Sequence, residues 1–500
     1  MRRAVERERV HMRKLTELQF DNSYARLPEA FYAKLAPTPL ADPHLVSFNE
    51  AAAELLDLDP SEAQTPEFIA YFSGQKLLPG AEPLAMLYAG HQFGVYVPQL
   101  GDGRAILLGE VRNARGERWD VHLKGAGATR YARGFDGRAV LRSTIREYLC
   151  SEAMHALGIP TTRALGIVGS DEPVQRETIE RAALLVRLAP THVRFGSFEV
   201  FHYRGQRERV KELADYVIAE HFIELTHAPD KYRNFLAEVV ARTARLVAEW
   251  QAVGFAHGVM NTDNMSIMGL TLDYGPFGFM DAFEFAFICN HSDYAGRYAF
   301  NAQPAVALWN LSCLAQALSS LVTREEAVAV LDKFQPIFAA HYGALMRRKL
   351  GLASARAEDA DLVLQLLDLL NANAVDYTNF FRRLSDFTSD SAASNEALRD
   401  MFTELAAFDA WAANYRARLL AEGSADDERK RRMDAVNPKY VLRNYLAQNA
   451  ITAAVEQHDY TEIDRLLALL RCPFDEQTEM DVYAASPPRW SEQLVVSCSS

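Results

Sequence analysis

The stretch of the chain most able to carry chemistry runs from His257 to Asn264 and reads His-Gly-Val-Met-Asn-Thr-Asp-Asn. Asp273-Tyr274-Gly275 follows nine residues later. An amide oxygen from Asn264 and a carboxylate from Asp273 suit a hard, octahedral cation such as Mg²⁺, which also takes phosphate oxygens. The two segments therefore predict a metal site that serves a phosphate group.

The same spacing is typical of kinase-like phosphotransferases, in which a loop of the form H-[RG]-D-x-x-x-x-N precedes D-[FY]-G. His257, Asn264 and Asp273 are in register with that pattern. The position of the catalytic aspartate, however, holds Val259, which cannot accept a proton. An ordinary kinase is thereby disfavoured. Asp263 is the nearest carboxylate that could act as the base, although in isolation it could equally cap a loop or helix.

A lysine and a glutamate could complete such a site. Lys124 ends a predicted strand, and Glu147 lies 23 residues later on a predicted helix. Kinase-like folds pair a strand lysine with a glutamate on the next helix and so hold the lysine against nucleotide phosphates. The alternative is that Glu147 lies on a solvated helix face beside Arg146.

Glycines and cations gather around Lys124. Gly101-Asp102-Gly103-Arg104 precedes a predicted strand, where glycines let backbone N–H groups approach a phosphate. The loop 125–138 holds three arginines among four glycines and includes Asp136 and Gly137. It would match a polyphosphate. The alternatives are an ordinary turn and a solvated basic loop.

Two more arginines, Arg187 and Arg194, lie seven residues apart around a predicted strand-to-turn junction. Two guanidinium groups can hold a terminal phosphate bidentately. They could equally form ion pairs between two lobes.

These residues must be positioned by an α+β fold. The first 200 residues mix short apolar runs with glycine-rich connections, and the remaining 300 consist mostly of segments with helical spacing. We predict an antiparallel pair of strands over 105–111 and 119–124, a helix over 141–157 that ends at Gly158, and a strand over 182–188. The further predicted helices are two within 208–250, broken near 228–230, and single helices over 308–321, 325–350, 359–370 and 396–419.

The composition narrows the function classes. The 500 residues include 53 Lys+Arg and 66 Asp+Glu, which gives a net charge of −13 and argues against a general nucleic-acid or anionic-membrane binder. No apolar run is long enough to span a membrane, and the basic N-terminus is followed by no apolar signal segment. Five cysteines without a C-x-x-C pair favour a reducing, cytoplasmic location. Whether the chain starts at Met1 or Met12 stays open.

At this point the chain resembles the selenoprotein O family, a kinase-like group of protein adenylyltransferases, from Phe20 to Ser500. The segments that carry the resemblance are Phe20-Asp21-Asn22-Ser23, Tyr88-Ala89-Gly90-His91-Gln92-Phe93-Gly94, Gly101-Asp102-Gly103-Arg104, Leu123-Lys124-Gly125, Asn261-Thr262-Asp263-Asn264-Met265, Leu272-Asp273-Tyr274-Gly275-Pro276 and Cys498-Ser499-Ser500. Eukaryotic members carry selenocysteine where this chain has Cys498.

The resemblance implies a protein-kinase-like fold of two lobes: a tail over 1–19, a mixed α/β N-lobe over 20–195 and a mostly helical C-lobe over 196–500. It implies that ATP binds in an inverted orientation, so that AMP passes to Ser, Thr or Tyr hydroxyls of proteins and pyrophosphate leaves. The nucleotide would be held by Gly101, Gly103, Arg104, Lys124, Asp136, Gly137, Arg187, Arg194 and Asp273. Asn264 and Asp273 would bind Mg²⁺ or Mn²⁺, Asp263 would be the general base, and Glu147 would pair with Lys124.

Several expectations accompany that reading. Family members are also reported to use UTP, and auto-modification is compatible with the chemistry. We hypothesise a reversible disulfide between Cys289 and Cys498 that tethers the tail and gates the site, with two unpaired thiols as the alternative. The competing functions are a conventional ATP-dependent kinase and a nucleotide-binding pseudokinase scaffold. Retention of Lys124, Asp263, Asn264 and Asp273 together speaks against the scaffold.

Overall fold

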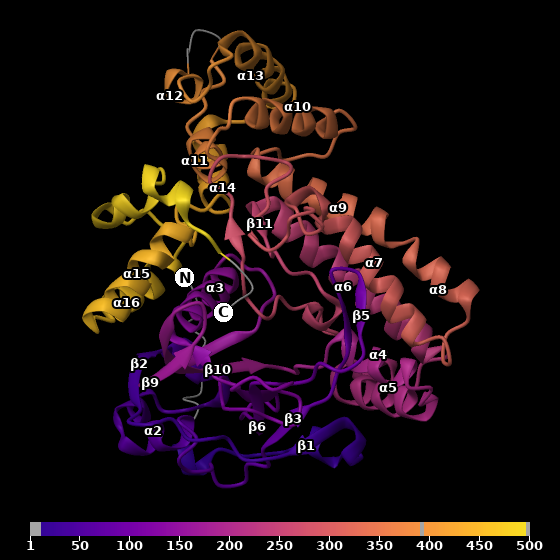
Figure 1. Ribbon diagram of the computed structural model, residues 1–500. Coiled ribbons are helices and arrows are strands. Elements are labelled where there is room, and N and C mark those ends of the chain that lie inside the picture. Colours follow the sequence, from indigo (N-terminus) through magenta and orange to yellow (C-terminus); the bar gives the residue numbers. More distant parts are fainter. Residues whose placement is uncertain (1–11, 391–394, 497–500) are drawn as a thin grey trace, which may run out of the picture.

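The computed structural model describes residues 12–390 and 395–496 and has a mixed α+β architecture, as expected (Figure 1). Its main sheet is antiparallel, with the strand order β1-β3-β6-β7-β10-β9-β2 and with β8 paired to β10. These strands are β1 (Tyr32–Lys34), β2 (His44–Phe48), β3 (Leu84–Met86), β6 (Ala105–Arg112), β7 (Arg118–Lys124), β8 (Ala139–Val140), β9 (Arg163–Gln175) and β10 (Ile179–Ala189). Two small sheets pair β4 (Gly90–Gln92) with β5 (Val95–Val97), and β11 (Phe255–Ala256) with β12 (Gly278–Phe279).

The centre of the main sheet positions Lys124. The expected antiparallel pair is confirmed as β6 and β7, and the side-chain oxygen of Asn113 accepts two backbone N–H groups of the turn between them, at 3.1 and 2.9 Å. β10 pairs with the other edge of β7. Lys124 therefore lies between Ala105 on β6 and Leu185 on β10.

The helix α3 (Leu141–Ala156) comes after β6 and β7 in the chain and packs against β9 and β10. Its predicted end is confirmed, because Gly158 adopts a φ of +81°, a conformation that ends helices and that glycine takes without steric cost. The predicted pair of helices within 208–250 is confirmed as α5 (Arg207–His221) and α6 (Lys231–Val253). A left-handed residue, Asp230 with φ +54°, directly precedes α6.

The other helices lie mostly beyond the sheet, in the orange and yellow part of Figure 1. α6 packs against α7, α8 and α9, and α4 packs against α7. The bounds are α1 (Glu50–Ala53), α2 (Pro66–Phe72), α4 (Phe195–Tyr203), α7 (Gln303–Ala317), α8 (Arg324–Leu331), α9 (Phe334–Lys349), α10 (Asp359–Ala372), α11 (Tyr377–Leu384), α12 (Glu396–Arg399), α13 (Leu405–Leu420), α14 (Asp426–Asp434), α15 (Asn444–Gln457) and α16 (Thr461–Leu470).

Two predicted helices are each divided in the structure, which corrects the sequence-based expectation. The segment 325–350 contains α8 and α9, separated at Asp332 and Lys333. Pro336 explains the break, since it lacks the N–H that would bond to the Asp332 carbonyl in a continuous helix. The segment 396–419 contains α12 and α13. Between them, the Asn373 side chain accepts bonds from the backbone N–H groups of Thr403 and Glu404 at 3.0 and 2.9 Å, which takes these donors out of a helix.

The two ends of the described chain pack on the sheet region. Residues 12–19 belong to the expected tail, yet Leu15 and Leu18 are buried in the same apolar cluster as β6 and β7. At the other end, α15 and α16 pack against α3. Buried residues of α3, α15 and α16 therefore share one apolar core.

Within residues 12–390 and 395–496, no helix combines the length and the apolar character needed to cross a bilayer.

Candidate functional site

Lys124 and Glu147 form the ion pair that their spacing predicted. Lys124 Nζ donates to Glu147 Oε2 across the gap between β7 and α3. The apolar stripe of α3, which includes Ile145 and Leu149, is buried, and Glu147 on the same helix is only 2% exposed. Burial lowers the pKa of Lys124, and the carboxylates of Glu147 and Asp273 counteract that effect. The pair confirms the local interpretation of these two residues.

The carboxylate of Asp273 is the centre of the cluster. Arg187 Nη1 lies 2.5 Å from Asp273 Oδ1, Arg194 Nη1 lies 2.6 Å from Oδ2, and Lys124 Nζ lies 3.9 Å from Oδ1. Burial alone would raise the pKa of Asp273, but Arg194, Arg187 and Lys124 outweigh it and hold that pKa well below its ordinary value. With Glu147 included, three cationic groups face two carboxylates, which leaves a net positive charge that suits a polyphosphate.

The arginines are fixed by further contacts. Arg187 Nη1 also lies 3.2 Å from Glu147 Oε1. Arg194 Nη1 donates to the backbone oxygen of Asp263 at 2.8 Å, and its guanidinium lies 4.4 Å from the centroid of the Tyr88 ring. Arg187 and Arg194 are 3% and 2% exposed, so each is held rigidly. Both arginines form ion pairs with Asp273, as the alternative interpretation of their sequence positions allowed, and Arg194 joins the loop of Asp263 to that carboxylate.

A buried histidine orients Arg187, and sequence reasoning did not identify it. Arg187 Nη2 donates to His122 Nδ1 at 2.9 Å, so this nitrogen must be the acceptor. His122 Nε2 then carries the proton and donates to Asp102 Oδ2 at 3.2 Å. Burial lowers the pKa of His122, which keeps the ring neutral. The only sequence signal was an alternation of polar and apolar residues on β7, which does not distinguish a functional histidine from a structural one.

Asp263 lies in a short turn, Thr262–Asn264, and is 7% exposed. Its Oδ2 accepts a bond from Gln92 Nε2 at 3.1 Å, whereas Oδ1 has no hydrogen-bond partner among the described residues. A Cβ at Gly90 would lie 2.7 Å from Oδ1, so a glycine is needed there for the close approach. Burial raises the pKa of Asp263 to about 7, which is the range that suits a proton acceptor near neutral pH. Gln92, another residue missed by sequence reasoning, belongs to this site.

Asn264 and Val259 lie on the same loop. Asn264 Nδ2 donates to the backbone oxygen of Val259 at 3.0 Å, which leaves the amide oxygen of Asn264 as a ligand atom. His257 supports the loop rather than the chemistry, since its Nε2 lies 3.0 Å from the Leu272 carbonyl oxygen. That contact links the histidine to the residue before Asp273.

The glycine-rich segments form a tightly packed layer beside this cluster. Gly101 has a φ of +76°, and a Cβ there would lie 2.6 Å from the Tyr131 ring. A Cβ on Gly103 would lie 3.0 Å from the Tyr131 carbonyl oxygen. Gly137 has a φ of +71°, and its Cβ would lie 2.1 Å from the backbone nitrogen of Ala128. These glycines are needed for close backbone packing, whatever they bind.

Arg104 and Asp136 differ in their relation to the cluster. Burial lowers the pKa of Arg104, and the carboxylates of Glu147 and Asp273 counteract that effect. Asp136 is bound by Arg176, with distances of 2.7 and 3.0 Å to its two oxygens, and among the described residues it contacts neither Lys124 nor Asp273. Arg176 was not singled out from the sequence, where nothing marks it.

Cys498 lies outside the described residues, so the structure gives no distance between its sulfur and that of Cys289. Cys289 lies beside the loop of Val259: its Sγ is 3.5 Å from the Ala256 carbonyl oxygen, and a Cβ at Gly258 would lie 2.7 Å from that sulfur.

Comparisons with known proteins show the family of the chain. The model of a family described as protein adenylyltransferase SelO matches residues 14–471. A relative from Myxococcus xanthus, named protein nucleotidyltransferase YdiU, is 61% identical over 489 residues, which cover 98% of this chain and all of the relative. Relatives of the same name from Thioalkalivibrio sulfidiphilus and Thiobacillus denitrificans are 60% and 58% identical over 98% of this chain and 100% of each. The chain belongs to the SelO family.

Proposed function

We propose that this protein transfers AMP from ATP to hydroxyl groups of proteins, with ATP bound in an inverted orientation in a kinase-like fold of two lobes. The family description and the names of the relatives support nucleotidyl transfer to proteins. The single observation that carries the inverted orientation is the convergence of Arg187, Arg194 and Lys124 on Asp273, together with Val259 at the position of the kinase base. The three cationic side chains would form a buried site for a terminal phosphate. Val259 cannot act as the base that γ-phosphate transfer would need.

The lobe boundary that we propose lies after Phe195, the first residue of α4. The lobe over 20–195 contains the main sheet, α3 and the glycine-rich loops, and the lobe over 196–500 contains Asp263, Asn264 and Asp273. Arg187 and Arg194 come from the first lobe, and both contact Asp273 of the second. In this arrangement, the nucleotide lies between the lobes.

Each cationic group has a role toward the triphosphate. Arg187 and Arg194 hold the buried terminal phosphate, and Lys124 neutralises charge on the pyrophosphate as it leaves. Gly101, Gly103 and Arg104 approach the phosphates from the sheet side, where the absence of a Cβ allows close backbone contact. Asp136 and Gly137 hold the outer loop through Arg176 and through the contact with Ala128.

The residues present fit a divalent cation. Asn264 offers its amide oxygen, because its Nδ2 is already bonded to Val259, and the Asp273 carboxylate keeps lone pairs beyond those that accept from the arginines. These hard oxygen ligands suit Mg²⁺ or Mn²⁺. When bound there, the cation would neutralise charge on phosphate oxygens.

Asp263 is the group that we assign as general base. In the described part of the chain its Oδ1 has no hydrogen-bond partner, so this oxygen keeps the capacity to accept the proton of a Ser, Thr or Tyr hydroxyl. As that proton passes to Asp263, the hydroxyl oxygen forms a bond to the α-phosphorus, and the bond from the α-phosphorus to the pyrophosphate oxygen breaks. Gln92 and Arg194 hold the loop of Asp263 in place, and most of the rate comes from this positioning.

The test uses ATP labelled on either the α- or the γ-phosphate, incubated with the purified protein, Mg²⁺ and a mixture of candidate protein substrates. We expect protein-bound label from the α-phosphate only, with none in the Asp273→Ala variant. Label from the γ-phosphate only would refute AMP transfer and restore a conventional kinase. Nucleotide binding without either label would favour a pseudokinase scaffold.

The same assay with UTP in place of ATP measures whether UMP is also transferred, and label on the enzyme itself would reveal auto-modification. We place the protein in the cytoplasm, in keeping with its thiols and its charge. We assign it no nucleic-acid or membrane partner.

The disulfide between Cys289 and Cys498 remains our proposal for control of the site. It is supported by the course of the described C-terminus, since His291 N donates to the Val496 carbonyl oxygen at 2.8 Å, two residues from each cysteine. A disulfide there would tether the tail beside the loop of Val259. Mass spectrometry of the oxidised, non-reduced protein should recover a peptide that contains both cysteines, and recovery of both thiols unlinked would refute the pairing.

A further inference from the structure

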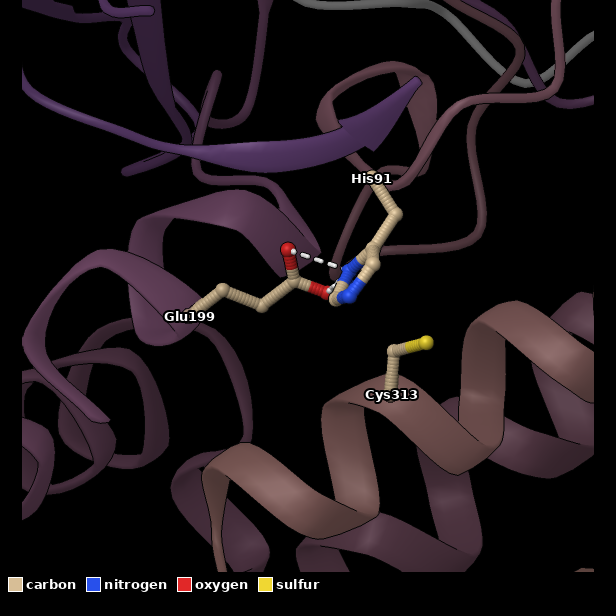
Figure 2. A group of neighbouring side chains, drawn as sticks. All are labelled: His91, Glu199 and Cys313. Carbon is tan, nitrogen blue, oxygen red and sulfur yellow. Dashed lines mark hydrogen bonds and ion pairs between the residues drawn. The ribbon is translucent and has the colours of Figure 1, made fainter. Parts of the chain in front are cut away.

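Three potential metal ligands meet next to Thr262, in the turn that also carries Asp263. His91 comes from β4, Glu199 from α4 and Cys313 from α7, and Figure 2 shows their side chains converging. His91 Nδ1 lies 3.3 Å from both carboxylate oxygens of Glu199. One ligand atom from each of the three residues lies within 4.8 Å of the others.

We propose that His91, Glu199 and Cys313 form a second cation site, selective for Zn²⁺ or a similar borderline ion rather than for Mg²⁺. Imidazole, carboxylate and thiolate together are a donor set that suits Zn²⁺, whereas Mg²⁺ takes oxygen ligands. The site is separate in chemistry and in residues from the oxygen ligands of Asn264 and Asp273.

The spacing fits a tetrahedral ion. Bond lengths of about 2.0 Å to nitrogen and oxygen put these two ligand atoms about 3.3 Å apart, which is the spacing between His91 and Glu199. The thiol, with a bond of about 2.3 Å, should lie about 3.6 Å from each of them, so closure draws Cys313 inward by about 1 Å. Three protein ligands leave the fourth position to water.

The environment of Glu199 favours a cation, while the positive charge of Arg297 acts on the other two residues, His91 and Cys313. Glu199 is fully buried, and in the described part of the chain its side chain contacts a neutral hydroxyl, Thr262 Oγ1 at 2.8 Å, and the His91 ring. Arg297 is held over the Trp309 ring, 4.6 Å from the ring centroid, and forms no ion pair with Glu199 within 4.0 Å in the described part of the chain. A divalent ion would supply the charge that this carboxylate lacks.

Metal binding would replace the thiol proton. Burial raises the pKa of Cys313 to about 12 and that of Glu199 to about 7, so the thiol is protonated at neutral pH without a cation. On binding, a bond forms between the ion and Sγ, and the S–H proton leaves to solvent. The predicted stoichiometry is one ion per chain.

The cluster is coupled to the loop that carries Asp263. Thr262 Oγ1, which donates to Glu199, accepts the His91 backbone N–H at 2.7 Å. The residues next to these two, Gln92 and Asp263, contact each other. An ion held by His91 and Glu199 would thus brace the turn Thr262–Asn264. This consequence rests on the proposed function, whereas the metal site itself does not.

The test is metal binding by the full chain, first stripped with a chelator and reduced, in the presence of excess Mg²⁺ to occupy hard oxygen sites. Zn²⁺ affinity is measured by competition with a chromogenic chelator, and Co²⁺ is added to record the thiolate-to-metal absorption band. We expect one equivalent of either ion and a thiolate band. Cys313→Ser should abolish the band, and both Cys313→Ser and His91→Gln should weaken Zn²⁺ binding at least ~100-fold.

Two controls match the variants. Cys472→Ser removes an exposed cysteine remote from the cluster, and His341→Gln breaks another His–Glu pair, 3.0 Å from Glu249, that has no cysteine. Both should bind like the unaltered chain. Glu199→Gln serves in place of Cys313→Ser if that variant does not fold. Zn²⁺ binding that survives Cys313→Ser and His91→Gln would overturn the site. So would the absence of Zn²⁺ binding by the unaltered chain.

Discussion

Asp263→Asn should make the protein more stable while it abolishes AMP transfer. The carboxylate is almost fully buried, one of its oxygens has no hydrogen-bond partner within residues 12–390 and 395–496, and burial raises its pKa from 3.8 to about 7. A shift of about 3 pKa units corresponds to about 4 kcal/mol of free energy lost on ionising the group in the folded protein. Asparagine has nearly the same shape and carries no charge, so it removes that cost.

The sign of the pH dependence follows from proton binding. Between the unfolded pKa of 3.8 and the folded pKa of about 7, the folded protein binds more protons at this position than the unfolded chain does. Stability of the unaltered protein therefore falls as pH rises through this window. The advantage of Asp263→Asn should be about 4 kcal/mol at about pH 8, fall to about half of that near pH 5.5, and almost vanish near pH 4.

The assay is urea denaturation of both proteins at these three pH values, with thermal midpoints as a second measure. Asp273→Asn is the matched control, because it removes a carboxylate whose pKa lies well below its usual value and should destabilise the protein at neutral pH. An Asp263→Asn variant that is no more stable than the unaltered protein at about pH 8, or that shows the same difference at every pH, would refute the assignment of Asp263 as a strained, buried base.

Three other substitutions probe the site. Arg187→Ala leaves Asp273, Glu147 and His122 without their shared partner and should lower the free energy of unfolding by about 3–5 kcal/mol, measured by denaturation; a loss below about 1 kcal/mol would mean that the buried network is not held by this arginine. Gly137→Ala forces a Cβ to within 2.1 Å of the Ala128 nitrogen and should weaken ATP binding at least ~10-fold by calorimetry. Gly134→Ala is the control, because Gly134 has a similar positive φ but open space around it, and this variant should bind ATP normally. Equal effects of the two substitutions would assign the loss to backbone strain alone. Val259→Asp should give no transfer from γ-labelled ATP, since the arginines still hold the γ-phosphate; a gain of γ-label transfer would contradict the inverted orientation.

The sequence was most informative where a turn, a helix end or a residue pair is set by residues close together in the chain. Gly158 marks the end of α3, and the turn after β6 is fixed by Asn113, so both elements could be predicted closely. The 23-residue separation of Lys124 and Glu147 spans one loop and part of one helix, so the pairing followed from a known arrangement of strand and helix.

Contacts over long separations could not be predicted in the same way. Arg187 and Arg194 lie 86 and 79 residues from Asp273. The pairing of β10 with β7 sets Arg187 opposite His122, and an isolated bridge joins Arg194 to Ser266, so the approach to Asp273 depends on tertiary contacts that spacing does not reveal. His122 was invisible for a related reason: a lone histidine in a strand becomes informative only when its two nitrogens are seen to contact Arg187 and Asp102. The break between α8 and α9 depends on Pro336, which is visible in the sequence. The break between α12 and α13 depends on Asn373, which acts from another segment of the chain.

The packing of α15 and α16 on α3 has a consequence for synthesis of the chain. Arg146, the neighbour of Glu147 on α3, contacts Asn444 at 3.2 Å, and Ser47 of β2 donates to Asp464 at 2.6 Å. A ribosome delivers residues 444–470 long after the sheet and α3 have emerged. The helix that carries Glu147 must therefore wait, with part of its apolar surface uncovered, until translation is almost complete. Nascent chains stalled before residue 444 should expose this surface to chaperones and proteases.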